Sequence, residues 1–203
     1  MEGSLVQAML IELVKTTVAL FVVVDPIGTV PIVVGLTRGM DVAQRQRNFR
    51  TAAYVGSILL IIFALAGQQI LTLFGISIYS FMIAGGILLL LLSIDLLLRG
   101  ETTQRVGATE DIGAVPIAFP LLIGPGAITT TIVTLQSSGF AIALPSIVIV
   151  MLVTWITLRY VDRIYAILGQ TGSAVVAKLM AIFVAAIAVQ YILTGIQFYY
   201  PTR

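Results

Sequence analysis

The chain has 203 residues, of which 59% are hydrophobic and only 10% are charged. A soluble domain carries about 25% charged residues, so this composition excludes an ordinary soluble protein and predicts an all-α polytopic membrane protein that contacts a lipid bilayer. The chain contains no Cys and no His, which excludes disulfides, thiolate or imidazole metal ligands and imidazole catalysis. The formal net charge of +2 does not indicate a nucleic-acid partner, because the Arg residues lie between the apolar stretches.

Six apolar stretches predict six membrane-spanning segments. They cover residues 5–37, 46–67, 76–99, 112–136, 140–160 and 175–199, and the second could extend to residue 74. A helix needs ~20 residues to cross a bilayer, and each stretch reaches about that length. Asp41 and Gln44 are spaced as in a capping box, which predicts a helix start just before the second stretch.

The first stretch is interrupted by Asp25-Pro26-Ile27-Gly28. A Pro has no backbone donor and restricts the residue before it, so the helix should break at Asp25. Pro26 should begin a new helix with Asp25 as its N-cap. A helix that begins inside the membrane presents free N–H groups and a partial positive charge, which together attract an anion. Interrupted helices of this kind mark substrate sites in transporters.

The fourth stretch carries a matching interruption at Gly124-Pro125, 99 residues further on (124 minus 25) and thus close to half of the 203-residue chain. Gly124 should be an N-cap and Pro125 the first helical residue. We therefore expect a single transmembrane domain over residues 1–203, built as an inverted repeat of residues 1–100 and 110–203. Each half has three spans and begins with its broken helix, so helices 1 and 4 are broken.

Basic residues predict the orientation of the spans. Three connections between spans carry Lys or Arg, whereas residues 68–77 and 137–139 carry none. The basic residues of these three connections are Arg38, Arg45, Arg47, Arg50, Arg99, Arg105, Arg159, Arg163 and Lys178. Basic connections face the cytoplasm, so both termini should lie outside a cell (inner or plasma) membrane, and residues 38–50 should meet anionic headgroups.

Asp25 is the ionisable residue expected deepest in the membrane, and two roles are open for it. It could cap the new helix, or it could exchange a proton and couple proton movement to transport. The matching position in the second half is the uncharged Gly124. This asymmetry leaves a place for a carboxylate near Gly124 and for an ammonium near Asp25, which suits a zwitterionic amino acid. Thr29 and Thr129 follow the interruptions closely and are the better candidates among the threonines.

Other polar and small residues suggest structural roles. Glu12 and Lys15 are spaced to pair on one helix face, and Asp95 and Arg99 to form an anchoring pair. Gly85-Gly86, Gly35 with Gly39, and the Ala-rich stretch of residues 181–189 form small-residue faces. Such faces permit close helix packing within the bundle or in a homo-oligomer.

The motifs DPIGTVP at residues 25–31 and IGPGAITT at 123–130, within a three-plus-three arrangement, resemble the MarC family of integral membrane proteins over essentially the whole chain. Its members include the archaeal small neutral amino acid transporter SnatA. The resemblance implies a secondary transporter of glycine, alanine and similar amino acids, coupled to a proton or sodium gradient. It implies a substrate site formed by Asp25, Ile27, Gly28, Thr29, Gly124, Gly126, Ala127 and Thr129, with Asp25 as the coupling residue.

Alternatives remain. A channel or exporter for another small solute could use the same interruptions, and a scaffold would not explain two matched ones. An intramembrane aspartyl protease would need two facing Asp residues, whereas Asp25 and Asp95 should lie at different depths. No nucleotide-binding motif is present, so ATP-driven transport is not expected. We expect no enzyme, no cofactor and no metal.

Overall fold

A computed structural model of the chain describes residues 2–37, 39–99 and 113–200, and this part contains helices and no strand. The helices are α1 (Glu2–Val24), α2 (Val30–Leu36), α3 (Val42–Leu73), α4 (Ile78–Arg99), the π-helix η1 (Gly113–Leu122), α5 (Pro125–Ser138), α6 (Phe140–Arg159) and α7 (Val161–Tyr199). The predicted all-helical fold is confirmed for these residues.

Five of these helices are long and apolar enough to cross a membrane in the described part of the chain. They cover Val6–Val24, Val42–Leu73, Ile78–Leu98, Phe140–Arg159 and Thr171–Tyr199. The predicted fourth span is absent from this set because η1 has only 10 residues and α5 only 14. That η1 and α5 cross the membrane together as one broken helix stays a prediction.

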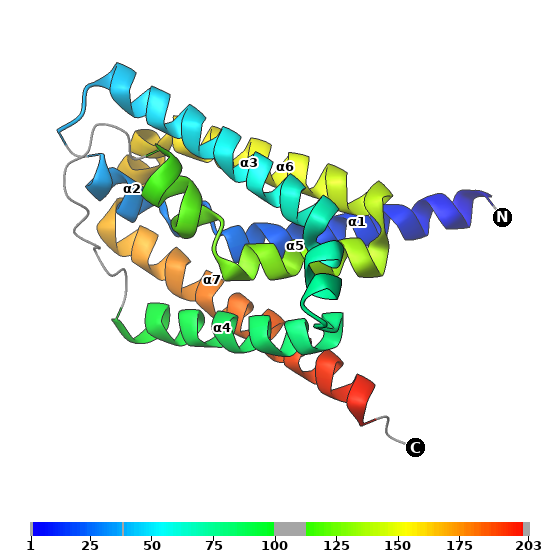
Figure 1. Cartoon of the computed structure of the whole chain (residues 1–203). Helices are drawn as coiled ribbons and strands as arrows, with labels where there is room; N and C mark the ends of the chain where they lie inside the picture. The colour runs from blue at the N-terminus through cyan, green and yellow to red at the C-terminus, as the bar shows by residue number, and fades with distance from the viewer. Residues whose placement is uncertain (1, 38, 100–112, 201–203) are drawn as a thin grey trace.

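The helices form three layers, which Figure 1 shows one above another. One outer layer pairs α3 with α6, and the other pairs α4 with α7. The middle layer contains α1 and α5, which also contact each other. The largest buried cluster joins α1, α2, α3, η1, α5 and α6, so the middle layer packs firmly against the α3–α6 layer.

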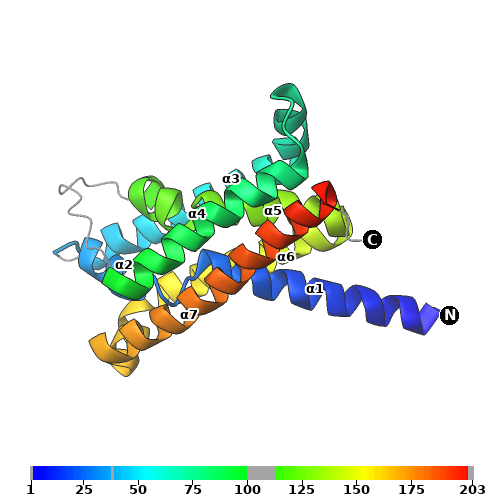
Figure 2. The same ribbon diagram turned by 90° about the horizontal axis from the view of Figure 1, so that it is seen from below.

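Both chain termini lie at one end of the bundle and the basic segments lie at the other end (Figures 1 and 2). The start of α3, the end of α4 and the α6–α7 junction share the basic end. At the start of α3, the Asp41 carboxylate accepts a hydrogen bond from Gln44 N (2.8 Å), and Gln44 Oε1 accepts one from Asp41 N (3.3 Å). The predicted capping box is therefore confirmed.

The predicted spans at residues 140–160 and 175–199 agree with the apolar helices Phe140–Arg159 and Thr171–Tyr199. The connection between them is itself helical, because α7 begins at Val161. Val161, Ile164 and Tyr165 recur with helical spacing and pack against the core, so the segment buries one face as a helix does. The helix bends at Gly169, which has φ +64°. This left-handed conformation is open to Gly, and it separates a short first stretch of α7 from the long apolar one.

Small residues bring α4 and α7 close together. A methyl group added to Gly86 of α4 would lie 2.7 Å from Ala188 O and 2.8 Å from Ile192 Cγ1, both on α7. Gly195 of α7 faces Tyr79 and Ile83 of α4 in the same way. This confirms close packing at Gly86, whereas a methyl group on Gly35 would meet nothing within 4 Å.

The contrast between these two glycines gives a matched test of the α4–α7 contact. Gly86→Ala should destabilise the fold by about 1–3 kcal/mol because the added carbon overpacks the crossing. Gly35→Ala should be neutral or stabilise by less than about 1 kcal/mol, since Ala favours the helix. Unfolding of the detergent-solubilised protein measures both, and equal stability of the two variants would contradict the packing described here.

Candidate functional site

The chain leaves helical geometry at Asp25 and re-enters it at Val30. The last turn of α1 closes with the bond from Asp25 N to Phe21 O (2.9 Å), and Asp25 itself has φ +44°. Among the described residues it is the one non-glycine with positive φ. This conformation turns its carboxylate over the following backbone, where Oδ1 accepts a hydrogen bond from Gly28 N (3.0 Å). A side chain on Gly28 would collide with that carboxylate, so Asp25 could keep its present position only beside glycine.

The predicted start of the second helix at Pro26 was wrong, because residues 26–29 form a turn and α2 begins at Val30. Pro31 explains the shift. A Pro disfavours helical geometry at the residue before it and clashes with the carbonyl four residues back, so it belongs in the first turn of a helix. The capping contact predicted for Asp25 is nevertheless present, because its carboxylate binds Gly28 N in the turn before α2.

The second interruption follows a π-helix. In η1, Ile123 N donates to Ala118 O (2.9 Å), a bond that spans five residues. Pro116 and Pro120 lie within η1 and supply no N–H, which disfavours an ordinary α-helix over this stretch. The start of η1 is held by Gly113 N, which donates to the side chain of buried Asn48 on α3 (3.0 Å).

Helix α5 then begins without a side-chain cap. Gly124 has extended backbone (φ −81°, ψ 179°), as an N-cap should, and Pro125 is the first helical residue. These assignments confirm the predicted start. Gly124 has no side chain to accept from the helix, and no other side chain of the described residues caps it. The first turn of α5 therefore keeps free donors and the positive end of the helix dipole.

The two interruptions lie close together inside the bundle. Val24 and Val30, on either side of the first, share one buried cluster with Ile123 and Ala127, on either side of the second. A methyl group on Gly126 would collide with Leu89 of α4 and lie 3.1 Å from Val23 of α1. Both junctions fall part-way along the bundle, away from its ends (Figure 1). The structure thus brings together the two segments that contain all eight predicted site residues.

The threonines differ in what their hydroxyls can still do. The hydroxyl of Thr29 donates to Pro26 O (3.1 Å), and that of Thr129 donates to Pro125 O (2.9 Å). Both side chains are buried, and each hydroxyl donates its proton to a backbone carbonyl of its own turn. Thr131 is 1% exposed, and its hydroxyl has no hydrogen-bond partner among the described residues. Sequence reasoning placed Thr129 ahead of Thr131, because spacing does not reveal which hydroxyls the backbone already uses.

Two predicted ion pairs have different outcomes. Glu12 does not pair with Lys15, and its Oε1 accepts a hydrogen bond from Ser138 Oγ at the end of α5 (2.8 Å). The predicted Asp95–Arg99 pair involves the side chain of Arg99, which lies outside the described residues. Within residues 2–37, 39–99 and 113–200, no three acidic side chains gather into a group that could hold a metal ion.

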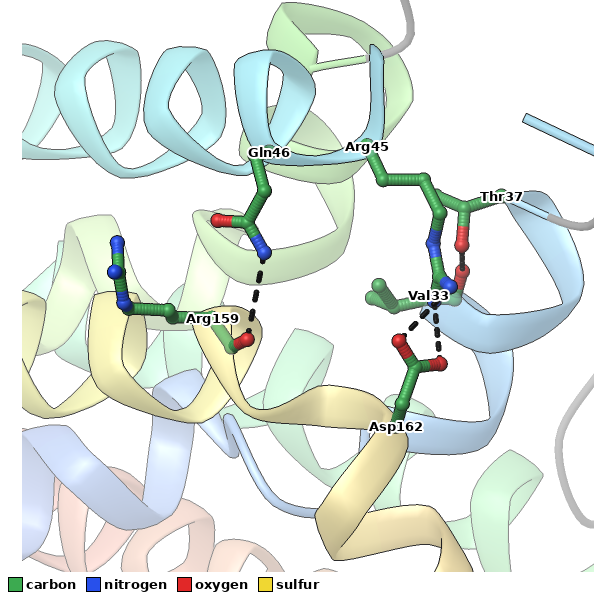
Figure 3. Close-up of polar contacts among 6 residues, drawn as sticks. All are labelled: Val33, Thr37, Arg45, Gln46, Arg159 and Asp162. Atoms are coloured by element: carbon green, nitrogen blue, oxygen red, sulfur yellow. Dashed lines mark hydrogen bonds and ion pairs between the residues drawn. The ribbon is translucent and has the colours of Figure 1, made fainter. Parts of the chain in front are cut away.

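One ion pair at the basic end was missed from the sequence. Arg45 on α3 binds both carboxylate oxygens of Asp162 on α7, at 2.9 and 2.8 Å (Figure 3). Beside it, Gln46 Nε2 donates to Arg159 O at 3.5 Å (Figure 3). No spacing rule links residues 117 positions apart. The only signal was that all basic segments were expected at the same membrane face.

Long apolar helices and a buried, interrupted middle layer define a multi-pass integral membrane protein. The chain belongs to the MarC family, because the model for the "MarC family integral membrane protein" matches residues 10–200. The predicted family is thereby confirmed.

Relatives span nearly the whole chain. A UPF0056 membrane protein of Archaeoglobus fulgidus is 35% identical and covers 87% of this chain and 88% of its own. The UPF0056 membrane protein YhcE of Escherichia coli is 36% identical, and the match covers 92% of this chain and 93% of YhcE. The UPF0056 membrane protein MJ0972 of Methanocaldococcus jannaschii is 37% identical, and the match covers 88% of this chain and 84% of MJ0972. These names describe membrane proteins without a stated activity, and no solved structure matches the chain.

The cap at Asp25 can be tested by two substitutions. Asp25→Ala removes the acceptor for Gly28 N and places a less tolerant residue at positive φ, so it should cost about 1–2 kcal/mol or more. Asp25→Asn keeps an acceptor oxygen and tolerates the same backbone, so its unfolding temperature should stay near that of the unaltered protein. If Ala were tolerated as well as Asn, the carboxylate would not hold this turn.

Proposed function

We propose that this protein is a secondary active transporter of small neutral amino acids, with glycine and alanine as substrates and a proton or sodium gradient as the driving force. It would resemble SnatA in this specificity. The observation that carries the proposal is the asymmetry of the two interruptions. The first has a carboxylate, that of Asp25, bound to Gly28 N in the turn before α2, whereas the N-cap of α5 is Gly124, which has no side chain.

This asymmetry suits the two ends of an amino acid. The substrate carboxylate would bind the free donors of Gly126 and Ala127, where the α5 dipole favours negative charge. The substrate ammonium would bind Asp25 Oδ2, since Oδ1 is engaged by Gly28 N. Gly126 is already packed against Leu89 and Val23, so the surroundings favour a substrate with a very small side chain.

The layered packing supports an inverted repeat. Two of the layers pair corresponding helices of the two proposed halves, namely α3 with α6 and α4 with α7. Two such halves could rock against each other and expose a central site to either side in turn. The Arg45–Asp162 pair joins the halves at the basic end, and this end could open only if the pair separates. Partly exposed pairs contribute less than about 1 kcal/mol, so this contact is easily broken.

Uptake of labelled glycine into proteoliposomes tests the proposal, with proton and sodium gradients imposed in turn. The unaltered protein should give saturable uptake and counterflow, which separates a carrier from a channel. Asp25→Asn should abolish uptake under the coupling gradient because Asn cannot carry the charge. Uptake that survives this change would reduce Asp25 to a cap. A protein that takes up no glycine under either gradient would favour the alternative, an exporter or channel for another solute.

A second substitution tests the carboxylate site directly. Gly124→Asp should cap α5 and stabilise the protein by up to about 1 kcal/mol. It should also abolish glycine uptake, because its carboxylate occupies the donors that the substrate needs. Gly124→Ala adds a side chain without an acceptor and controls for the space available, so it should retain uptake. Loss of uptake in both variants would show a steric effect and would argue against carboxylate binding at this helix start.

A further inference from the structure

Two hollows that share Arg50 lie between α3 and α6, and together they are called the groove here. Its apolar part, about 440 Å³, is lined by residues such as Tyr54 and Ser57 of α3 and Val148, Leu152 and Trp155 of α6. A polar part of about 620 Å³ at the basic end is lined by Gln46, Arg159, Tyr160 and Arg163, among others. Arg50 lines both parts, so the polar and apolar parts adjoin at this residue.

The polar part carries an excess of positive charge. Arg50, Arg159 and Arg163 line it, and within the described residues none of the three lies within ion-pair distance of a carboxylate. The one acidic residue that lines it, Asp162, is engaged by Arg45. Figure 3 shows the Arg159 side chain extending away from Asp162. Three guanidinium groups are thus available to an anion, and this group forms planar paired hydrogen bonds with phosphate.

Aromatic rings hold two of these arginines in place. The Arg159 guanidinium lies 5.5 Å from the centre of the Trp155 ring, and that of Arg163 lies 5.4 Å from the centre of the Tyr160 ring. Trp155 also lines the apolar part, so its indole ring lies where the apolar part meets the Arg159 guanidinium of the polar part. A Trp beside basic residues is typical of the depth at which headgroups meet acyl chains.

We propose that this groove binds an anionic phospholipid. Its phosphate would lie among Arg50, Arg159 and Arg163, and one acyl chain would run past Trp155 along the apolar part. Val148 and Leu152 are 60% and 54% exposed on a helix long enough to span the membrane, so this part of the groove is open to the bilayer. Basic pockets between membrane helices bind anionic headgroups by the same physics. The proposal does not depend on the transported substrate.

Trp155 supplies the readout, because it is the only Trp in the chain. The full-length protein is reconstituted in phosphatidylcholine with increasing fractions of a phospholipid that carries brominated acyl chains, which quench a nearby indole. Brominated phosphatidylglycerol should quench Trp155 at a mole fraction at least about fivefold lower than brominated phosphatidylcholine, since each basic residue near the headgroup contributes about 1 kcal/mol. Equal quenching by the two lipids, or by neither because a second copy covers the groove, would overturn the proposal.

Variants separate a specific site from general surface charge. Arg50→Gln and Arg163→Gln should each lower the preference for phosphatidylglycerol about fivefold. Arg47→Gln is the matched control, because Arg47 is exposed on the same helix as Arg50 but lines neither part of the groove. An equal loss in the control would attribute the preference to the whole basic surface and would overturn the site.

A soluble headgroup separates lipid from free phosphate. Glycerol phosphate has the same phosphate chemistry but no acyl chain, so at millimolar concentration it should not relieve the quenching. Relief would show that phosphate alone competes for the arginines, so that the acyl chain adds little to binding, and would contradict the role assigned to the apolar part of the groove. Ser57→Leu, which fills the apolar part without changing charge, should reduce quenching by phosphatidylglycerol. Undiminished quenching in that variant would place the acyl chain elsewhere and contradict the proposed pose.

Discussion

The structure depends on one constraint, that a backbone donor or acceptor buried away from water must find a partner inside the protein. Two helices are interrupted within the bundle, and the interruptions release such groups. Asp25 N still bonds to Phe21 O, Gly28 N bonds to the Asp25 side chain, and Ile123 N reaches back to Ala118 O. A neighbouring helix also contributes, since Asn48 accepts from Gly113 N. Neither the N-cap residue of α2 nor that of α5 caps its helix with a side chain, so both helix starts keep backbone donors without such a partner.

Two similar interruptions therefore have different chemical character. The first contains its own carboxylate and is largely satisfied by the chain itself. The second has glycine before its helix and so no side-chain acceptor from that residue. The two interruptions differ in backbone geometry and in charge, and under the proposed function this difference suits a ligand with two unlike ends. The close packing around Gly126 and Ala127 limits the size of such a molecule.

The sequence predicted most helices, and it placed breaks in helical geometry at Asp25 and Gly124, because apolar length, Pro and Gly act locally. That each break divides one membrane-spanning helix stays a prediction. The sequence predicted the N-cap of α5 correctly for the same reason, since Gly124 and Pro125 are adjacent. It misplaced the start of α2, because the effect of Pro31 outweighed that of Pro26. It placed a connection between the last two spans, and the structure adds that this connection is helical, with Val161, Ile164 and Tyr165 following a helical period.

Other features could not be predicted because they depend on tertiary contacts. The Arg45–Asp162 pair joins residues that only the fold brings together. The partner of Glu12 proved to be Ser138 on α5 rather than Lys15 on its own helix. Whether a buried threonine keeps a free hydroxyl, as Thr131 does among the described residues, depends on rotamers that spacing does not specify. Family membership, by contrast, could be predicted from two short motifs.

The positive φ of Asp25 also limits how this position can change during evolution. The left-handed conformation is open to Gly and tolerated by Asn and Asp, whereas Glu, with the same charge, adopts it at a higher cost and places its carboxylate one carbon further away. Substitution of Asp25 by Asn or Gly would thus remove the charge and keep the turn, whereas substitution by Glu, which would shift the carboxylate, would strain the turn. The backbone therefore makes the charge at this position nearly all-or-none.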